Sequence, residues 1–383
     1  LLAAVFGGGA TKSGATVTTQ TALEVATVLA CTRVIAEGVA QVPLKLFQRT
    51  RDGARNPAID HPLYDKLHRR PNPWATSFEL RETVTMHAVL SGQAFCFLNR
   101  AAGRVAEIIP LDPGRVTVVR RPDLTLVYRV RSDAGEQREF PAESIWHLRG
   151  PSWDGYSGLP IVRLAREAIG LAMATEETQA RLHQRGLQPS GTYSVDGTLS
   201  PQQYKDLANW LQDNFAGSRN GGAPMVLDRN AKWHSLAVSG VDAQHLETRK
   251  HQVVEICAAM RVLPIMIGYS DKAATFASAE QMFLAHVVHT LGPWYERIEQ
   301  SMDCCLLTDQ ERADGYYVKH IVQGLLRGAM KDTAEYLHKL VLDGVMTRNE
   351  ARAALELNPL PNLDEPLTPA NMTVGAEPVA APT

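Results

Sequence analysis

PIVRLAREAIGLAMATEETQARLHQ, residues 160–184, is the stretch of sequence on which the fold depends. Its apolar residues recur at helical spacing on one side, among them Ile161, Leu164 and Leu171, so one long helix is predicted. At a rise of ~1.5 Å per residue this helix spans about 37 Å. Gly186 and Pro189 then end it. A long helix with an apolar stripe and a mixed-charge back is suited to packing side by side with another helix.

A compact α/β module and a second long helix follow the first. Ser200 and Pro201 form a helix start, an N-cap followed by a first-turn proline. The second long helix carries an apolar stripe that includes Leu246, Val253 and Ile256. The expected elements are strands at 191–195, 224–227 and 232–236, a helix from Ser200 to about Phe215, and the second long helix at 242–262. Two rods therefore flank a small module.

Upstream of the first rod, helices give way to a β region. Helices are predicted at 19–39, at 63–69 and from an N-cap at Ser77 to about Leu90, with a strand at 42–47. After Gly92 the sequence changes to short runs in which apolar and polar residues alternate. Clusters of turn-forming residues such as Asp112-Pro113-Gly114 separate these runs. These runs are residues 93–98, 105–109, 115–119, 125–130 and 145–148. They predict an antiparallel β region of an α+β protein, not a repeating βαβ pattern.

Downstream of the second rod, residues 263–277 break the helical pattern. A further long helix is expected over 279–307, capped by Ser278 and kinked at Pro293. A strand at 316–321 and two closing helices follow, one at 330–342 and one in which Thr347 and Glu350 form a capping box. From Asn358 onward the chain is rich in Pro and Ala and is predicted to be disordered.

Composition excludes several classes of protein. The chain has 383 residues, 45% of them hydrophobic, and its longest apolar runs are too short for a membrane-spanning helix. The net charge of -2 lacks the basic excess typical of a protein that grips nucleic acid by its phosphates. The five cysteines have no framework spacing, which favours reduced, buried thiols in a cytosolic setting. The first residues form a short Gly-rich stretch without a secretory leader.

Candidate catalytic and metal motifs are weak. The stretch at 7–13 suggests a phosphate loop, but Thr11 stands where the Walker pattern needs Gly. His286 and His289 lie near Cys304 and Cys305, yet adjacent cysteines point in different directions on a helix. The stretch at 155–158 lacks the spacing of a nucleophile elbow. The carboxylates are scattered and form no cluster of the kind that binds two metals. Neither a catalytic residue, a metal site nor a cofactor is therefore predicted.

Basic residues near the second rod allow two interpretations. Arg249, Lys250, Arg261 and Lys272 occur there, and Glu247, Glu255 and Asp271 alternate with them. One interpretation is a solvated face of mixed charge. The other is a weakly attractive surface near a polyanion, and the sequence leaves both open.

The order of these blocks resembles the portal proteins of tailed bacteriophages. The similarity is greatest to the HK97-type family, which also occurs in phage-derived gene transfer agents. It extends from about Thr19 to Pro361 and rests on short motifs in the family's order. They are GYSGLP at 155–160, GLQPSG at 186–191, DAQHLETRK at 242–250, LP and IG at 263–268, AEQ at 279–281, LGPW at 291–294 and GVMTRNEAR at 344–352.

The resemblance implies a portal fold of class α+β, with a mixed α/β wing, long stem helices, a small α/β clip, a kinked long helix and a short helical crown. By analogy with the family, the chain divides into nine segments. They are a flexible arm (1–18), the wing (19–158), a stem helix (159–185), the clip (186–240), a second stem helix (241–262), the tunnel loop (263–277), the kinked helix and return to the wing (278–330), a reduced crown (331–357) and a disordered tail (358–383).

The implied function is that of a dodecameric ring at one vertex of a virion or virus-like capsid, assembled in the host cytoplasm. Double-stranded DNA would pass through it during packaging and ejection. The implied partners are the terminase large subunit, a head–tail adaptor and the major capsid protein, with no membrane. The alternatives are another phage head–tail connector or structural protein, or an enzyme acting on nucleic acid, which the missing phosphate loop opposes.

The resemblance also suggests which residues carry these functions. The tunnel-loop candidates facing DNA are Ser270, Asp271, Lys272, Ala273 and Thr275. The stem-channel candidates are Arg249, Lys250 and Arg261. The candidates for partner docking on the clip are Arg219, Asn220, Arg229 and Lys232. A near-neutral lining with a few cations suits DNA that slides, because many lysines would hold each phosphate.

Overall fold

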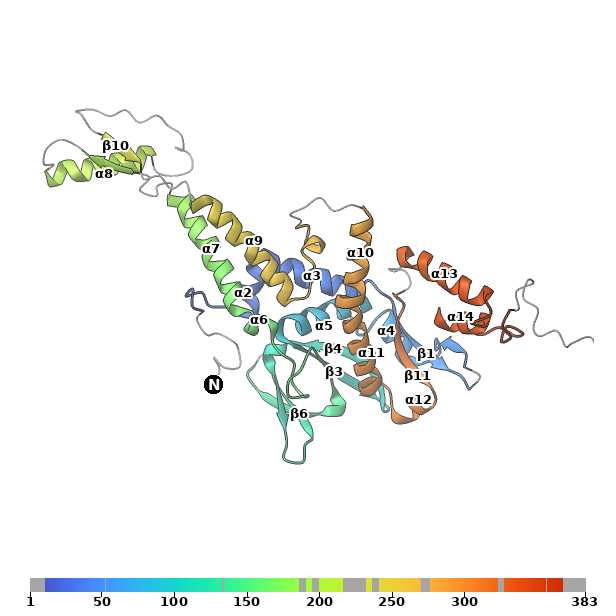
Figure 1. The fold of residues 1–383 in the computed structure, drawn as a ribbon. Helices are drawn as coiled ribbons and strands as arrows, with labels where there is room; N and C mark the ends of the chain where they lie inside the picture. The colour runs from blue at the N-terminus through green and yellow to red at the C-terminus, as the bar shows by residue number, and fades with distance from the viewer. Residues whose placement is uncertain are drawn as a thin grey trace, which may run out of the picture. The chain divides into compact units, whose positions relative to one another are not determined.

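The computed structural model describes residues 11–51, 53–132, 134–185, 191–194, 200–215, 232–235, 241–269, 276–322, 327–355 and 357–367. The chain divides into two compact units (Figure 1). Unit 1 comprises Leu1–Leu29 and Val162–Ala259, and unit 2 comprises Ala30–Ile161 and Met260–Thr383. In the described part, no helix has the length and apolar character needed to cross a membrane.

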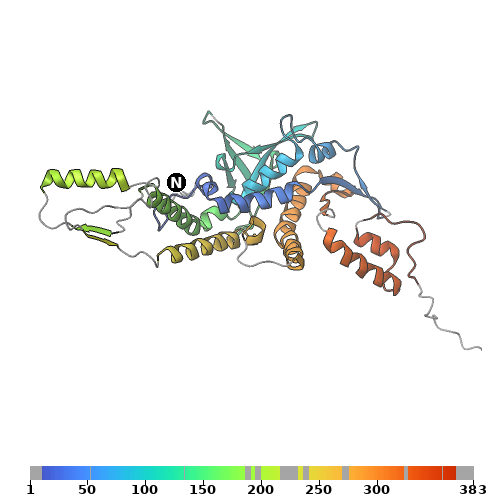
Figure 2. The ribbon, with the colours of Figure 1, turned by 90° about the horizontal axis from the view of Figure 1, so that it is seen from above.

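Unit 1 is dominated by two long helices, α7 (Arg166–Arg185) and α9 (Val241–Ala259), which lie side by side in both ribbon views (Figures 1 and 2). The long helix predicted at 160–184 is therefore present, but a break at Ala165 separates the short α6 (Ile161–Leu164) from α7. The second predicted rod ends at Ala259, three residues early. The unit also contains α2 (Thr19–Glu24), whose N-cap Thr18 forms a capping box with Thr21.

A small α/β module joins the two long helices. β9 (Gly191–Ser194) pairs antiparallel with β10 (Lys232–Ser235), with Tyr193 opposite Trp233. α8 (Pro201–Phe215) begins at the predicted proline. The strand predicted at 224–227 lies outside the described residues.

Unit 2 contains three small antiparallel sheets, as the alternating runs predicted. Their strand orders are β4-β3-β8, β5-β6-β7 and β11-β1-β2. The strands are β1 (Leu44–Arg49), β2 (Arg55–Pro57), β3 (Gln93–Ala101), β4 (Arg104–Leu111), β5 (Val116–Arg120), β6 (Leu126–Arg131), β7 (Gln137–Pro141), β8 (Ile145–Arg149) and β11 (Tyr316–His320). Phe95, Tyr128 and Ile145 form a buried cluster between the first two sheets. The sequence prediction missed β2 and β7, which lack alternation of apolar and polar residues.

Helices connect and cover these sheets. α4 (Pro62–His68) packs on β1 and β4, and α5 (Ser77–Ser91) packs on β3. The N-cap of α5 is Thr76, not Ser77, because Thr76 and Glu79 satisfy each other's backbone N–H groups. The helix predicted at 19–39 is two helices, because extended backbone at Val25 separates α2 from α3 (Ala26–Ala40).

The helix containing Pro293 is interrupted, as predicted. α10 (Phe276–His286) passes through a π-helical turn (Val287–Leu291) into α11 (Gly292–Leu306), and Pro293 occupies the first turn of α11. A proline in that position removes no hydrogen bond from α11, so the irregular backbone falls just before it. The helix begins at Phe276 rather than after Ser278. α11 packs on β8 and β11, and α12 (Asp309–Ala313) precedes β11.

The C-terminal helices agree with the prediction, and part of the segment after them is described as well. α13 (Arg327–Leu342) and α14 (Arg348–Ala354) match the prediction, including the Thr347–Glu350 capping box. Of the tail expected to be disordered from residue 358, residues 358–367 are described and contact α14, and residues 368–383 lie outside the described residues. The Asn349 side chain donates to the Leu360 carbonyl (2.9 Å) and to Asp364 (2.7 Å). The Asn358 side chain accepts from the backbone N–H of Arg55 (2.8 Å). The polar contacts, which composition does not reveal, replace the missing apolar bulk.

The cysteine prediction holds in part. Cys31, Cys96 and Cys257 are buried and free, whereas Cys304 is exposed and Cys305 is half-buried. The two adjacent residues sit on α11, so they cannot both face the sheets on which that helix packs.

Candidate functional site

The paired helices of unit 1 are held in register by polar side chains. A guanidinium N–H of Arg249 donates to Gln179 Oε1 (3.0 Å), and Gln252 Nε2 donates to Thr175 Oγ1 (3.1 Å). Gln252 is buried, so its amide depends on this partner. Because contacts at 179 and 175 meet residues 249 and 252, the two helices run antiparallel. The pair forms a hairpin whose turn is replaced by the small α/β module.

This hairpin is nearly neutral. α7 carries three arginines and three glutamates, and α9 carries Arg249 and Lys250 against three acidic residues. Arg249 and Lys250 are both exposed, and Arg249 is engaged with Gln179 across the pair. The surface has the mixed charge that the sequence suggested, so both interpretations of these basic residues stay open.

Arg261, the third stem candidate, belongs to unit 2. It adopts a left-handed backbone conformation (φ 56°) and is exposed. Its carbonyl accepts a hydrogen bond from Thr290 Oγ1 (2.7 Å), in the π-helical turn. Burial and the nearby charge of Arg261 lower the pKa of Arg297. The backbone that leads into the proposed tunnel loop is thus tied to the irregular turn in the long helix.

The tunnel-loop candidates Ser270, Asp271, Lys272, Ala273 and Thr275 all lie outside the described residues. The described part of the loop begins with a 3-10 turn (Pro264–Ile267) that ends at Gly268, whose φ is 78°. Residues 263–269 therefore contain a defined turn where the sequence predicted only a break in the helix.

Of the clip candidates, Arg219, Asn220 and Arg229 lie outside the described residues. Lys232 is the first residue of β10, opposite Ser194, and its backbone alone is described. The sequence analysis did not single out Tyr204 and Trp210 on α8, whose side chains are 66% and 42% exposed. Large exposed aromatic side chains are typical of docking surfaces, and the aromatic residues of this amphipathic helix were the available signal.

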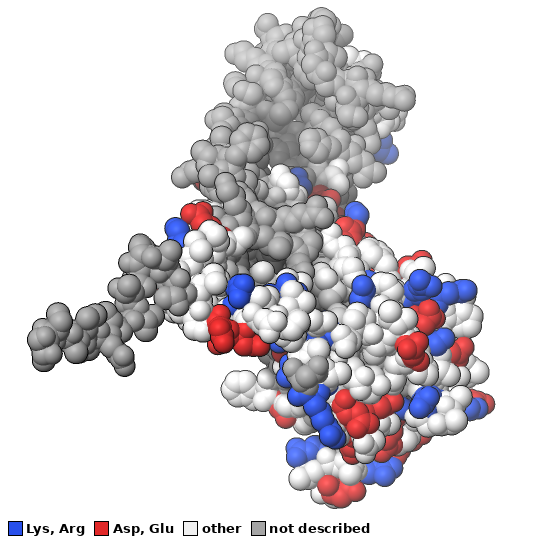
Figure 3. All heavy atoms as spheres, turned by 90° about the vertical axis from the view of Figure 1, so that its right-hand side faces the viewer, with Lys and Arg blue, Asp and Glu red and all other residues white. Residues whose placement is uncertain are grey.

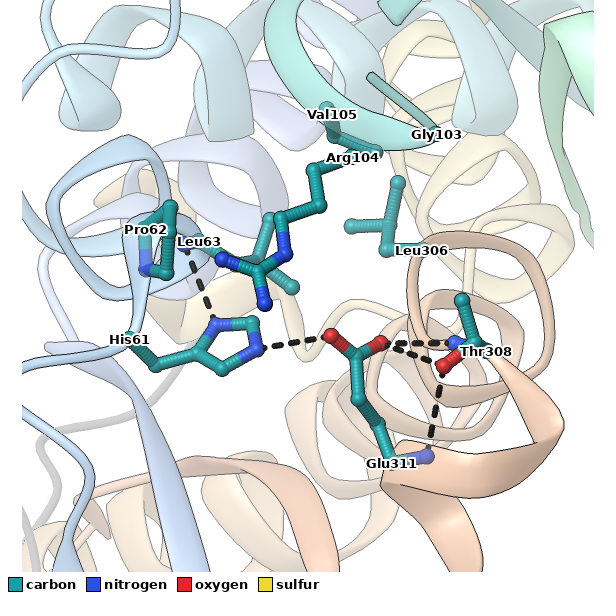
Figure 4. A pocket seen from close by; sticks show the side chains of 9 residues that line it. All are labelled: His61, Pro62, Leu63, Gly103, Arg104, Val105, Leu306, Thr308 and Glu311. Atoms are coloured by element: carbon teal, nitrogen blue, oxygen red, sulfur yellow. Dashed lines mark hydrogen bonds and ion pairs between the residues drawn. The ribbon is translucent and has the colours of Figure 1, made fainter. Parts of the chain in front are cut away.

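Unit 2 contains a small pocket between α4, β4 and α12 (Figure 4). His61 Nε2 lies 2.9 Å from Glu311 Oε1, and His61 Nδ1 accepts from the backbone N–H of Leu63 (3.2 Å). Burial opposes ionisation of Glu311, but the hydrogen bonds from Thr308 and His61 outweigh it and lower the pKa of Glu311. The pair therefore links the N-termini of two helices that are far apart in sequence.

This pocket does not assemble a metal site. Nowhere in the part of the chain that the structure describes do three or more His, Cys, Asp or Glu side chains gather as metal ligands. His286, one of the residues weighed for zinc, is buried, and its pKa is lowered by that burial. On the face shown in Figure 3, Lys and Arg alternate with Asp and Glu over the described residues, without a large patch of one sign.

The chain thus contains a pair of antiparallel helices with an inserted module, and a unit of small sheets packed against an interrupted long helix. Both can be compared with known proteins. The family model for phage portal proteins matches residues 26–356. The chain belongs to the phage portal protein family. The resemblance in the sequence is thereby confirmed, and the function of this chain is that of a portal protein.

Individual relatives agree with this membership. The portal protein of Enterobacteria phage HK97 is 27% identical over 345 residues, covering 89% of this chain and 81% of the relative. The probable portal protein of Streptomyces phage phiC31 is 29% identical over 367 residues, which cover 93% of this chain and 79% of the relative. The neck of a native gene transfer agent particle, computed with C12 symmetry, contains a chain of similar fold. Its TM-score is 0.63 at 23% identity, over 89% of this chain and 94% of that one. The α+β portal fold is therefore confirmed.

Proposed function

We propose that twelve copies of this portal protein close into a ring that conducts double-stranded DNA into and out of a capsid. The observation that carries the proposal is the antiparallel α7–α9 hairpin with the α/β module at its turn. Rods of this kind can line an opening when identical subunits repeat around an axis, and such a ring needs head-to-tail contacts. The C12 symmetry of the related neck supports the copy number.

The role of the ring is mechanical rather than enzymatic. The near-neutral charge of α7 and α9 supports a surface along which DNA moves without being held. Lys272 and its neighbours Ser270, Asp271, Ala273 and Thr275 would approach the DNA as the tunnel loop. The energy for packaging would come from a partner motor.

The proposed partners follow from the same role. The module of residues 186–240 would dock the terminase large subunit during packaging and a head–tail adaptor afterwards. Arg219, Asn220, Arg229 and Lys232 would take part, and Tyr204 and Trp210 add exposed aromatic area on α8. Residues 19–158, the wing, would face the major capsid protein. The location would be the portal vertex of a virion or virus-like particle after assembly in the host cytoplasm.

The copy number can be tested with the full chain. A closed ring of twelve chains of 42.0 kDa has a mass of roughly 500 kDa, which mass photometry resolves from a monomer. Only monomers under all assembly conditions, including the presence of capsid and adaptor proteins, would contradict the ring. ATPase and nuclease assays on the same material test the mechanical role.

The DNA contact can be tested by reversing one charge. Lys272→Glu is expected to reduce the DNase-protected DNA in packaged particles while the ring mass stays unchanged. Lys339→Glu is the matched control, because it makes the same charge reversal at a side chain that is 68% exposed on α13, outside the surfaces proposed to meet DNA or a partner. Equal packaging by the two variants would reject the role of Lys272.

A further inference from the structure

One face of the small sheet β11-β1-β2 places like charges directly opposite each other. Paired residues of neighbouring strands lie on the same side of a sheet, and alternate residues of one strand share a face. On this face the register pairs Lys45 with Lys319, Phe47 with Tyr317, and Arg49 with Arg55. None of these six residues is acidic. The face therefore carries one aromatic pair flanked on each side by a pair of cations.

This arrangement disfavours the sheet on its own. Like charges directly opposite each other on neighbouring strands repel, and two such pairs occur here within five residues of β1. The opposite face buries Leu44 and Leu46 in the core, so the register cannot slip to separate the cations. The ammonium group of Lys319 lies 2.9 Å from the carboxylate of Glu299, which supplies one negative charge. Breaches of a local stability rule are expected where a surface has a function.

A cavity borders the aromatic pair. Its volume is about 110 Å³, several times the ~30 Å³ share of one water molecule, so it has room for one side chain. Phe47, Tyr317 and Leu357 contribute to an apolar lining, and Arg55 and Lys319 line it as well. The rings of Phe47 and Tyr317 are stacked with their centroids 5.8 Å apart. The cavity thus offers an apolar wall between cationic side chains.

Side chains of this chain already occupy backbone donors at both edges of the sheet. At β2, the backbone N–H of Arg55 donates to the Asn358 side chain (2.8 Å). At β11, the backbone N–H groups of Val318 and His320 donate to carboxylates of α11. Addition of a partner strand at an edge would break these bonds. An extended partner is therefore expected to cross the face.

The geometry points to this face as a docking site for an extended segment of the major capsid protein, with an acidic, an apolar and a second acidic side chain at alternate positions. Alternate residues of an extended segment lie ~6.7 Å apart, which is also the spacing of the three pairs along β1. The acidic side chains meet the two cation pairs, and the apolar side chain enters the cavity. The choice of the capsid protein rests on the proposed function, in which the wing faces the capsid.

Duplex DNA matches this face less well. Its backbone carries a charge at each nucleotide and has no apolar side chain to enter the cavity between the cation pairs. The faces of its bases are stacked on one another, so Phe47 and Tyr317 have none to stack on. Two cation pairs separated by an apolar cavity instead complement a segment in which acidic and apolar side chains alternate.

The first experiment measures binding of a synthetic peptide, Glu-Ser-Leu-Ser-Glu with blocked ends, to the immobilised full chain by surface plasmon resonance. Saturable binding is expected below ~1 mM, at least ~10-fold tighter than for the rearranged peptide Glu-Glu-Leu-Ser-Ser. Arg49→Glu is expected to weaken binding at least ~10-fold, and Arg49→Lys much less. Lys339→Glu is the matched control, because it reverses a charge that is 68% exposed on α13.

Three results of this experiment would overturn the inference. They are equal binding of the two peptides, no saturation up to ~1 mM, and stronger binding of a DNA duplex than of the peptide under the same salt conditions. Arg49 is exposed, so its variants are expected to fold, and unchanged circular dichroism checks this. Peptide binding needs no ring, so the assay tests the face even if the proposed function fails.

The second experiment identifies the partner in particles. A photoreactive phenylalanine derivative replaces Pro57, which is exposed and lies opposite Phe47 on the same face. After irradiation, covalent products with the capsid protein that map to an acidic segment support the inference. Products with DNA, an adaptor or a second portal copy, or no product in particles that contain the ring, contradict it. Wild-type particles without a ring would instead refute the proposed function.

Discussion

Asp303, on α11, is a half-buried carboxyl group whose charge the fold disfavours. Burial raises its pKa from 3.8 to about 6, and the nearby charge of Glu299 adds to this, against the backbone N–H of Val318 and the cations Arg312 and Lys319. Because the pKa in the folded state lies above that of the unfolded chain, the native state binds more protons between about pH 4 and pH 6. The stability of the protein therefore falls as the pH rises through that window.

Asp303→Asn is expected to remove this loss. The pKa difference corresponds to ~3 kcal/mol at about 1.4 kcal/mol for each pKa unit. Partial access of solvent screens the charge, so the expected gain at pH 7.5 is ~1–2 kcal/mol of unfolding free energy. The new amide oxygen still accepts from the Val318 N–H, which lies 2.7 Å from Asp303 Oδ1. The gain should shrink as the pH is lowered and disappear below about pH 4, where Asp303 is protonated in both states.

Urea unfolding of the full chain, at one protein concentration and over pH 4.5 to 8, measures this difference. Glu299→Gln provides the opposite control. Burial opposes ionisation of Glu299, but contacts from His320 and Lys319 outweigh it and lower its pKa, so loss of its charge should destabilise the protein at neutral pH. If Asp303→Asn is less stable than wild type at pH 7.5, the ionised carboxylate is a favourable partner and the reasoning fails.

Three further substitutions test other parts of the structure. Gly158→Ala places a Cβ against the Gly92 carbonyl and should lower the unfolding free energy by ~3 kcal/mol or more in thermal melts. Gly155→Ala should cost only ~1 kcal/mol, because the space there is open and only the left-handed backbone (φ 80°) is strained. Arg81→Met leaves the helix-end carbonyl of Ala40, 2.7 Å from the guanidinium, without its donor and should cost ~1–3 kcal/mol in urea unfolding. Gln252→Ala removes the bond to α7 and should cost about 1 kcal/mol, with faster amide hydrogen exchange on that helix; unchanged exchange would show that the bond does not hold the pair.

Prediction from the sequence worked where a local rule decides the structure. The helical periodicity at 160–184 and the capping box at Thr347 identified elements that the structure contains. It worked less well where a local pattern is absent. In β7 (Gln137–Pro141) apolar and polar residues do not alternate. The strand forms because it pairs with β6, which the local sequence does not reveal. The residues of the candidate site came mainly from the family resemblance, because the contacts of Arg249 with Gln179 and of Gln252 with Thr175 join two helices that no local pattern brings together.

The acidic residues of α11 show why such contacts are hidden in the sequence. Glu299 and Asp303 are about one helical turn apart on α11, and this spacing alone does not indicate what either carboxylate binds. In the structure Glu299 accepts from the backbone N–H of His320 (2.8 Å) and Asp303 from that of Val318. Four residues of helix rise ~6 Å, and two residues of strand rise ~6.7 Å, so the two carboxylates match alternate N–H groups on β11.

Side chains therefore satisfy the backbone N–H groups along the outer edge of β11. β11 pairs with β1 on one side, and on the other its N–H groups at 318 and 320 bind carboxylates instead of another strand. An open edge invites unlimited pairing with other chains, whereas a ring requires each copy to meet its neighbours at one defined surface. Glu299 and Asp303 thus satisfy the backbone donors on the side of β11 away from β1, and the burial that this contact requires raises the pKa of Asp303.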